Sequence, residues 1–165
     1  MALIDEIKAT AQLFEISNCV NLQKAYYKHM AEIARVVKVV KAEDVLTKSQ
    51  LNYIKKVLKP KKNQCYRNAH LLTYSLQGFT YCEGKVAAPF EIDHAFNKYT
   101  DAKGNEYYID ITFEFALHED PTQHEYVVLG EYDKKKITEV ANKTRVYGDI
   151  YDYIWKHEHA ADLIK

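Results

Sequence analysis

The sequence predicts a single α+β domain spanning residues 1–165, in which helices precede an antiparallel sheet. Two observations predict this class. No glycine or proline occurs before Pro60, and apolar residues recur there at helical spacing. After Pro60, short alternating stretches are separated by turn residues, which is typical of strands. A chain of 165 residues with 47% hydrophobic content can bury one proper core.

Residues 1–62 are expected to form a helical layer of about three helices. The first ends near Ser17 and Asn18, and the second carries a broad apolar face that extends to Val40. Thr47 is placed to cap the third helix, and Pro60 ends it. The inward residues of this third helix are expected to be Leu51, Ile54, Val57 and Leu58.

Residues 63–165 are expected to form the second part of the domain. Asn63 can cap a helix that begins near Gln64, and Gly78 stands where a C-terminal cap belongs. The later pattern predicts strands and helices joined by a hairpin turn at residues 101–105. The expected strands are 79–88, 93–99, 106–115 and 126–132, and the expected helices are 133–143 and 149–164.

The charge balance argues against several classes of partner. Lys plus Arg and Asp plus Glu both total 23, so the chain has no global field that would draw it to nucleic acid or anionic lipid.

The N-terminus lacks the pattern of a signal peptide, and no apolar run is long enough to span a bilayer. The three cysteines include no CxxC pair, which argues against a disulfide scaffold. We therefore expect a reduced, cytoplasmic protein.

Three residues form a candidate catalytic constellation. Cys65 opens the predicted helix at Gln64, where the helix terminus favours a thiolate. His94 lies early in one strand, and Asp110 lies in the strand across the hairpin. A hairpin centred on Lys103-Gly104 makes these two near neighbours, so Asp110 can orient the ring of His94. A thiol, a base and an orienting carboxylate are the parts of a nucleophilic triad.

Further residues are candidates for the walls of such a site. The backbone N–H of Cys65 suits an oxyanion, and Gln64 is a candidate for a second donor. Asn68, one turn after Cys65, either faces the same cleft or is an exposed helical amide. Glu83 alternates with Cys82 in one strand, and we expect Glu83 to be the polar pocket residue. Cys19, at a helix junction, is expected to be structural.

The motifs QCYRNA, DHAFN and YIDIT resemble those of the papain-like cysteine hydrolase superfamily, and of its transglutaminase-like branch in particular. The run CYRNA, YCEG, DHAFN and IDIT also resembles small proteins of phages and bacteria. The resemblance covers roughly residues 63–115. One departure is Phe96, where the transglutaminase-like pattern more often has tryptophan.

The resemblance implies that Cys65 is the nucleophile, His94 the base and later the acid, and Asp110 the orienting group. The expected activity is acyl hydrolysis or acyl transfer on a protein, peptide or small amide substrate, with neither a cofactor nor a metal. The histidines are dispersed and form no HExxH motif, which argues against a metal hydrolase. The alternative is a non-catalytic phage-encoded protein that uses its tyrosines to bind a host protein.

Overall fold

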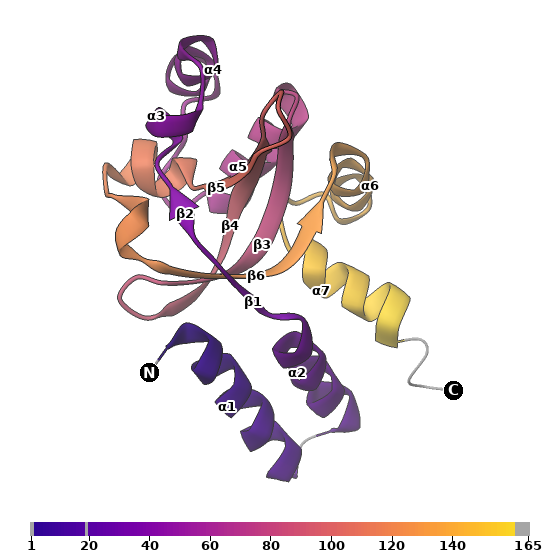
Figure 1. The fold of residues 1–165 in the computed structure, drawn as a ribbon. Coiled ribbons are helices and arrows are strands. Elements are labelled where there is room, and N and C mark those ends of the chain that lie inside the picture. The colour runs from indigo at the N-terminus through magenta and orange to yellow at the C-terminus, as the bar shows by residue number, and fades with distance from the viewer. Residues whose placement is uncertain (1, 19, 161–165) are drawn as a thin grey trace.

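The computed structural model of the chain describes residues 2–18 and 20–160, and it has an α+β fold (Figure 1). Cys19 and the end of the predicted last helix lie outside the described residues. A six-stranded sheet occupies the middle of the molecule, and helices lie around it. No helix among the described residues is long and apolar enough to cross a membrane.

The sheet has the strand order β1-β6-β3-β4-β5-β2. Four of its neighbouring pairs are antiparallel, but β2 pairs with β5 in parallel, so the predicted purely antiparallel sheet is wrong in this one pair. The long central pair is formed by β3 and β4. The strands are β1 (Arg35–Val37), β2 (Val39–Val40), β3 (Phe79–Ala87), β4 (Glu91–Thr100), β5 (Glu106–Ile109) and β6 (Glu125–Tyr132).

The two edges of the sheet are consecutive strands. β1 pairs with β6 and β2 pairs with β5, although only Lys38 separates β1 from β2. The sheet must therefore curl until its edges approach one another. The predicted helical layer is wrong at this point, because the run RVVKVV is extended. Its valines are β-branched and suit a strand, and Val37 and Val39 are buried inside the curl.

The two N-terminal helices, α1 (Leu3–Ile16) and α2 (Asn21–Ile33), pack side by side below the sheet in Figure 1. Their inner residues Leu3, Ile7 and Met30 form one apolar cluster with Val127 of β6 and Tyr151 near the C-terminus. The first two predicted helices are confirmed, except that the second ends at Ile33 rather than Val40. The N-terminal helices are thus joined to the sheet by a continuous core.

The predicted third helix is a composite of short segments. These are α3 (Ala42–Val45), α4 (Lys48–Tyr53) and a π-helical turn, η1 (Ile54–Leu58). Thr47 caps α4 as predicted, because its hydroxyl accepts the N–H of Gln50 at 3.2 Å and its own N–H donates to the Gln50 side chain at 2.9 Å. Val57 was expected inside but is 64% exposed. The widened π turn shifts it away from the core side.

One face of the sheet is covered by helices from the second half of the chain. They are α5 (Cys65–Ser75), α6 (Lys134–Thr144) and α7 (Ile150–Ile154), the last continuing as the π-helical turn η4 (Trp155–His159). Ala69 of α5, Tyr81 and Ala95 of the sheet and Ile137 of α6 share a core cluster there. The opposite face, inside the curl, is filled by residues that include Phe96 and Tyr126.

The return strand of the hairpin is shorter than predicted. The turn at residues 101–105 has Gly104 at φ 85°, as expected, but β5 ends at Ile109 rather than near residue 115. The chain then forms a π-helical turn, η2 (Thr112–Leu117), and a 3-10 turn, η3 (Pro121–Gln123). Asp110 causes this change, because its carboxylate accepts the N–H groups of Thr112 at 2.9 Å and Phe113 at 3.2 Å.

Candidate active site

The hairpin brings His94 and Asp110 together as the sequence predicts. In the β4–β5 pair, Asn97 faces Ile109 and Tyr99 faces Tyr107, which is the register of a hairpin centred on Lys103-Gly104. Asp110 directly follows the last paired residue. Its carboxylate oxygen Oδ2 lies 2.6 Å from Nε2 of His94. The two side chains are 0% and 4% exposed, so this contact is protected from water.

The carboxylate of Asp110 is held by donors on both oxygens. Oδ1 accepts the N–H groups that begin η2, and Oδ2 accepts the hydroxyl of Tyr126 at 2.9 Å in addition to His94. A buried carboxylate with this many donors is fixed in place. Asp110 is therefore suited to hold the His94 ring in one orientation and one tautomer.

The surroundings of His94 favour its protonated form. The ring lies among Phe96, Phe113 and Tyr126, with ring centroids between 5.3 and 6.4 Å away. Burial by itself lowers the pKa of His94. The Asp110 carboxylate and the sulfur of Cys65 outweigh burial and raise this pKa to about 10. Because Nε2 is bound to Asp110, Nδ1 is the ring nitrogen that remains for the sulfur.

Cys65 is the first residue of α5, as predicted, and its side chain is half-buried. The eleven-residue helix directs its unpaired N–H groups and its positive end at this position. Gln64, rather than Asn63, occupies the N-cap position, and its exposed side chain makes no capping bond. Asn63 instead has φ 57° and turns the chain into the helix. The sulfur of Cys65 is close enough to the His94 ring to raise its pKa, and the ring contacts Asp110.

Asn68 does not face the site as a free donor. It is 0% exposed, and its Nδ2 donates to the carbonyl of Lys61 at 2.8 Å and to the hydroxyl of Thr112 at 3.0 Å. Its Oδ1 accepts the N–H of Lys61 at 3.0 Å. Both amide hydrogens are thus in use, so Asn68 neither stabilises an oxyanion nor is exposed. It fixes the loop before Cys65 to the segment after Asp110.

Glu83 lies beside a cavity, and Cys82 lies in the core on the other face of β3. The Glu83 carboxylate accepts the N–H groups of Ile150 and Tyr151 at 2.9 and 2.8 Å, and so binds the start of α7. It also accepts the hydroxyl of Tyr81 at 2.7 Å. Burial raises the pKa of Glu83 despite these donors. Glu83 therefore combines a structural role with a place in the cavity wall.

Sequence reasoning missed the role of Tyr126. It was grouped with tyrosines that can form a contact surface, but it is 1% exposed and its hydroxyl binds Asp110. Tyr126 lies in β6 and its partner Asp110 follows β5, 16 residues earlier, so no local motif marks the pair. A tyrosine within an apolar strand, which needs a buried partner for its hydroxyl, was the available signal.

The described residues contain no group of three or more His, Cys, Asp or Glu side chains arranged to hold a metal ion. In comparisons with known proteins, no family model, no curated protein and no solved structure matches the chain.

Proposed function

We propose that the protein is a cysteine-dependent acyl hydrolase or acyltransferase with a papain-like or transglutaminase-like core. One observation carries the proposal. The buried Asp110 holds Nε2 of His94 at 2.6 Å, which leaves Nδ1 for the sulfur of Cys65 at the start of α5. A histidine that served only to fill the core would not need a fully buried carboxylate partner and a neighbouring thiol.

The geometry supports a two-step reaction on an amide, isopeptide or peptide bond. The thiolate of Cys65 attacks the carbonyl carbon, and His94 gives its Nδ1 proton to the leaving amine as the C–N bond breaks. This leaves a thioester on Cys65 and a neutral His94. His94 then takes a proton from water, or from an acceptor amine, which attacks the thioester and regenerates the thiolate. Asp110 orients the ring throughout and does not exchange a proton.

The negative oxygen of the tetrahedral intermediate needs donors. The backbone N–H of Cys65, at the first position of α5, has no partner within its own helix and is a candidate donor. The exposed side chain of Gln64 is free to add a second donor, since it makes no capping bond. Removing one such donor costs about 10²–10³-fold in turnover in enzymes of this type.

The test begins with the thiol. We expect iodoacetamide at neutral pH to alkylate Cys65 much faster than Cys82, whose burial raises its pKa. Peptide mapping by mass spectrometry assigns each alkylated residue. Incubation with an activated acyl ester should then trap a thioester on Cys65 in the wild type and in Cys82→Ser, but not in Cys65→Ala. Replacing His94 by Gln should abolish thioester formation while leaving the fold intact.

Equal and slow alkylation of Cys65 and Cys82, with no thioester formed, would refute the proposal. The chain would then fit the alternative of a non-catalytic binding or inhibitor protein that keeps the scaffold.

A further inference from the structure

The helix that carries Cys65 must be held at a fixed position relative to the ring of His94, because a nucleophile reacts efficiently only while its base stays aligned with it. A series of buried hydrogen bonds joins these two sides of the site. Thr112 lies in the middle of this series. It is the first residue of η2, it follows Asp110 by two positions, and it is 4% exposed.

Thr112 contacts the carboxylate side of the site through its backbone. Its N–H donates to Oδ1 of Asp110 at 2.9 Å, and Oδ2 of the same carboxylate lies 2.6 Å from Nε2 of His94. Asp110 is 0% exposed and lies in a packed interior, which transmits displacements from one group to the next. The position of Thr112 and the orientation of the His94 ring are thus linked through one carboxylate.

Thr112 contacts the nucleophile side of the site through its hydroxyl. Oγ1 accepts a hydrogen from Nδ2 of Asn68 at 3.0 Å. Asn68 lies one turn after Cys65 in α5, and its amide also binds the backbone N–H and carbonyl of Lys61 in the loop that leads to Cys65. The hydroxyl of Thr112 therefore ties the start of α5 to the segment that holds Asp110.

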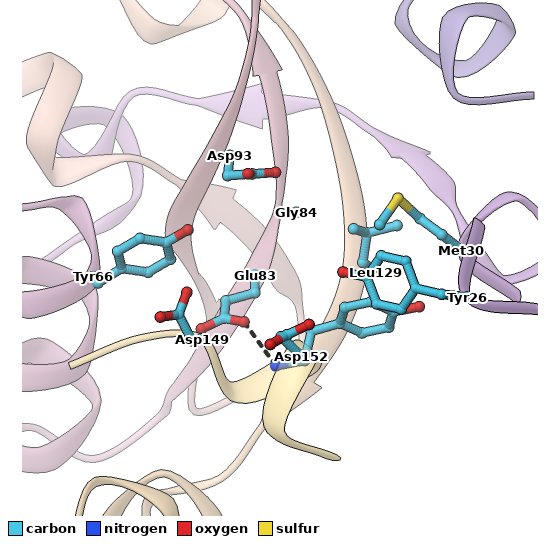
Figure 2. A pocket seen from close by; sticks show the side chains of 10 residues that line it. Tyr26, Met30, Tyr66, Glu83, Gly84, Asp93, Leu129, Asp149 and Asp152 are labelled. Atoms are coloured by element: carbon cyan, nitrogen blue, oxygen red, sulfur yellow. Dashed lines mark hydrogen bonds between the residues drawn. The ribbon is translucent and has the colours of Figure 1, made fainter. Parts of the chain in front are cut away.

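The burial of Thr112 keeps it from contacting a substrate directly. Neither Thr112 nor any residue of the proposed triad lines the cavity beside Glu83 that Figure 2 shows. The carboxylate of Glu83 is bonded there to the backbone at the start of α7. Thr112 can therefore affect a reaction at Cys65 only through the groups that it positions.

We propose that Thr112 is a positioning residue, whose hydroxyl holds the helix of Cys65 in place against the His94–Asp110 pair. The inference rests on the proposed function of this site and deepens it. A displacement of about 1 Å at a reacting centre can cost about 100-fold in rate. The loss of this one hydroxyl should therefore lower the rate at Cys65 more than a similar loss elsewhere in the core.

The same helix offers a matched control. Thr73 is 3% exposed, and its Oγ1 accepts a hydrogen from Nδ2 of Asn97 at 3.0 Å. Asn97 keeps the carbonyl of Ala69 as an acceptor when this hydroxyl is removed. Thr73 lies near the other end of α5 from Cys65. Thr73→Val and Thr112→Val thus remove the same kind of buried hydrogen bond, but only the second lies beside the site.

The experiment measures acetylation of Cys65 by p-nitrophenyl acetate. The sulfur takes the acetyl group and p-nitrophenol leaves with the thiol proton, so absorbance gives the rate and peptide mapping gives the residue. We expect Thr112→Val to slow the reaction about tenfold or more, because the helix of Cys65 is no longer held in place. Thr112→Ser and Thr73→Val keep the bond to Asn68 and should stay within about twofold of the wild type.

Denaturant unfolding completes the comparison, since the two valine variants should lose similar free energies of unfolding. Val has the branched shape of Thr, so Thr112→Val should fold. If circular dichroism shows that it does not, Thr112→Ala removes the hydroxyl without adding a methyl group, and it should show the same slowing.

The outcomes separate the two proposals. A wild-type rate in the variant without the hydroxyl, an equal slowing in Thr73→Val, or no recovery in Thr112→Ser overturns the role of Thr112 and leaves the proposed function standing. If Cys65 of the wild type is acetylated no faster than Cys82, the proposed function fails, and the role of Thr112 fails with it.

Discussion

Replacing Asp110 by Asn tests the central contact of the site. The amide keeps the shape of the carboxylate, and its oxygen can still accept the N–H groups of Thr112 and Phe113. Its NH₂ group, however, then faces Nε2 of His94, so Nε2 must become an acceptor. The ring proton moves to Nδ1, and Nδ1 can no longer take a proton from Cys65. Without the Asp110 charge, burial also lowers the pKa of His94.

The magnitude follows from the loss of the base that takes the proton of the Cys65 thiol. A positioned side chain that takes a proton from the reacting group contributes about 10²- to 10⁴-fold to the rate. Asp110→Asn removes this role from Nδ1 of His94. We therefore expect the alkylation rate of Cys65 at pH 6.5 to fall by about 100-fold or more.

The assay is the rate of iodoacetamide modification of Cys65 between pH 5 and 9, followed by mass spectrometry. Asp110→Asn should react more slowly than the wild type at pH 6.5, because Nδ1 of its His94 already carries the ring proton. Tyr126→Phe is the graded control, because it removes one neutral donor to Asp110 and leaves the charge. Its effect should stay below about fivefold, as expected for one hydrogen bond of about 1 kcal/mol.

An Asp110→Asn protein that folds, as judged by circular dichroism, and that reacts at the wild-type rate at pH 6.5 would refute the reasoning. In that case Asp110 would be only a cap for η2, and His94 a buried ring without a role in ionising Cys65.

Three further predictions concern stability and are measured by denaturant unfolding. Asn68→Ala should cost about 2–4 kcal/mol, because it removes the fully buried amide that binds the backbone N–H and carbonyl of Lys61 and the hydroxyl of Thr112. Gly84→Ala should cost more than Gly104→Ala. A Cβ at Gly84 would lie 1.9 Å from the carbonyl oxygen of Val127 in β6, whereas at Gly104 it meets nothing within 4 Å. The opposite order would contradict this close approach of β6 to β3 at Gly84. Because the pKa of His94 is raised from 6.5 to about 10, its contribution to stability is complete below about pH 6.5 and is lost as the pH rises through about 10; His94→Gln should not show this loss.

Local chemistry explains what the sequence predicted well. Thr47 with Gln50, and Gly104 in its turn, act on neighbours within a few residues, so their effects are readable from the sequence. The hairpin register followed from the turn alone, and it brought His94 next to Asp110.

Long-range partners explain what the sequence did not predict. The valine run at residues 35–40 fits either a helix face or a strand, and only its distant partners in β5 and β6 decide between them. Asp110 was read as a strand residue, but its carboxylate ends the strand by binding the backbone that follows. The partners of Asn68 lie in the preceding loop and in η2, and the spacing on α5 gives no sign of them.

Residues 35–40 supply both edge strands of the sheet, and this has a consequence for folding during synthesis on the ribosome. Their partners, Tyr108 and Ile109 on one side and Tyr126 to Val128 on the other, are made about 70 to 90 residues later. Until then the run VVKVV has the composition of a segment that aggregates, and the basic residues Arg35, Lys38 and Lys41 that interrupt and flank it act as gatekeepers. Removing these charges should therefore lower the soluble yield more than it lowers the stability of the folded protein.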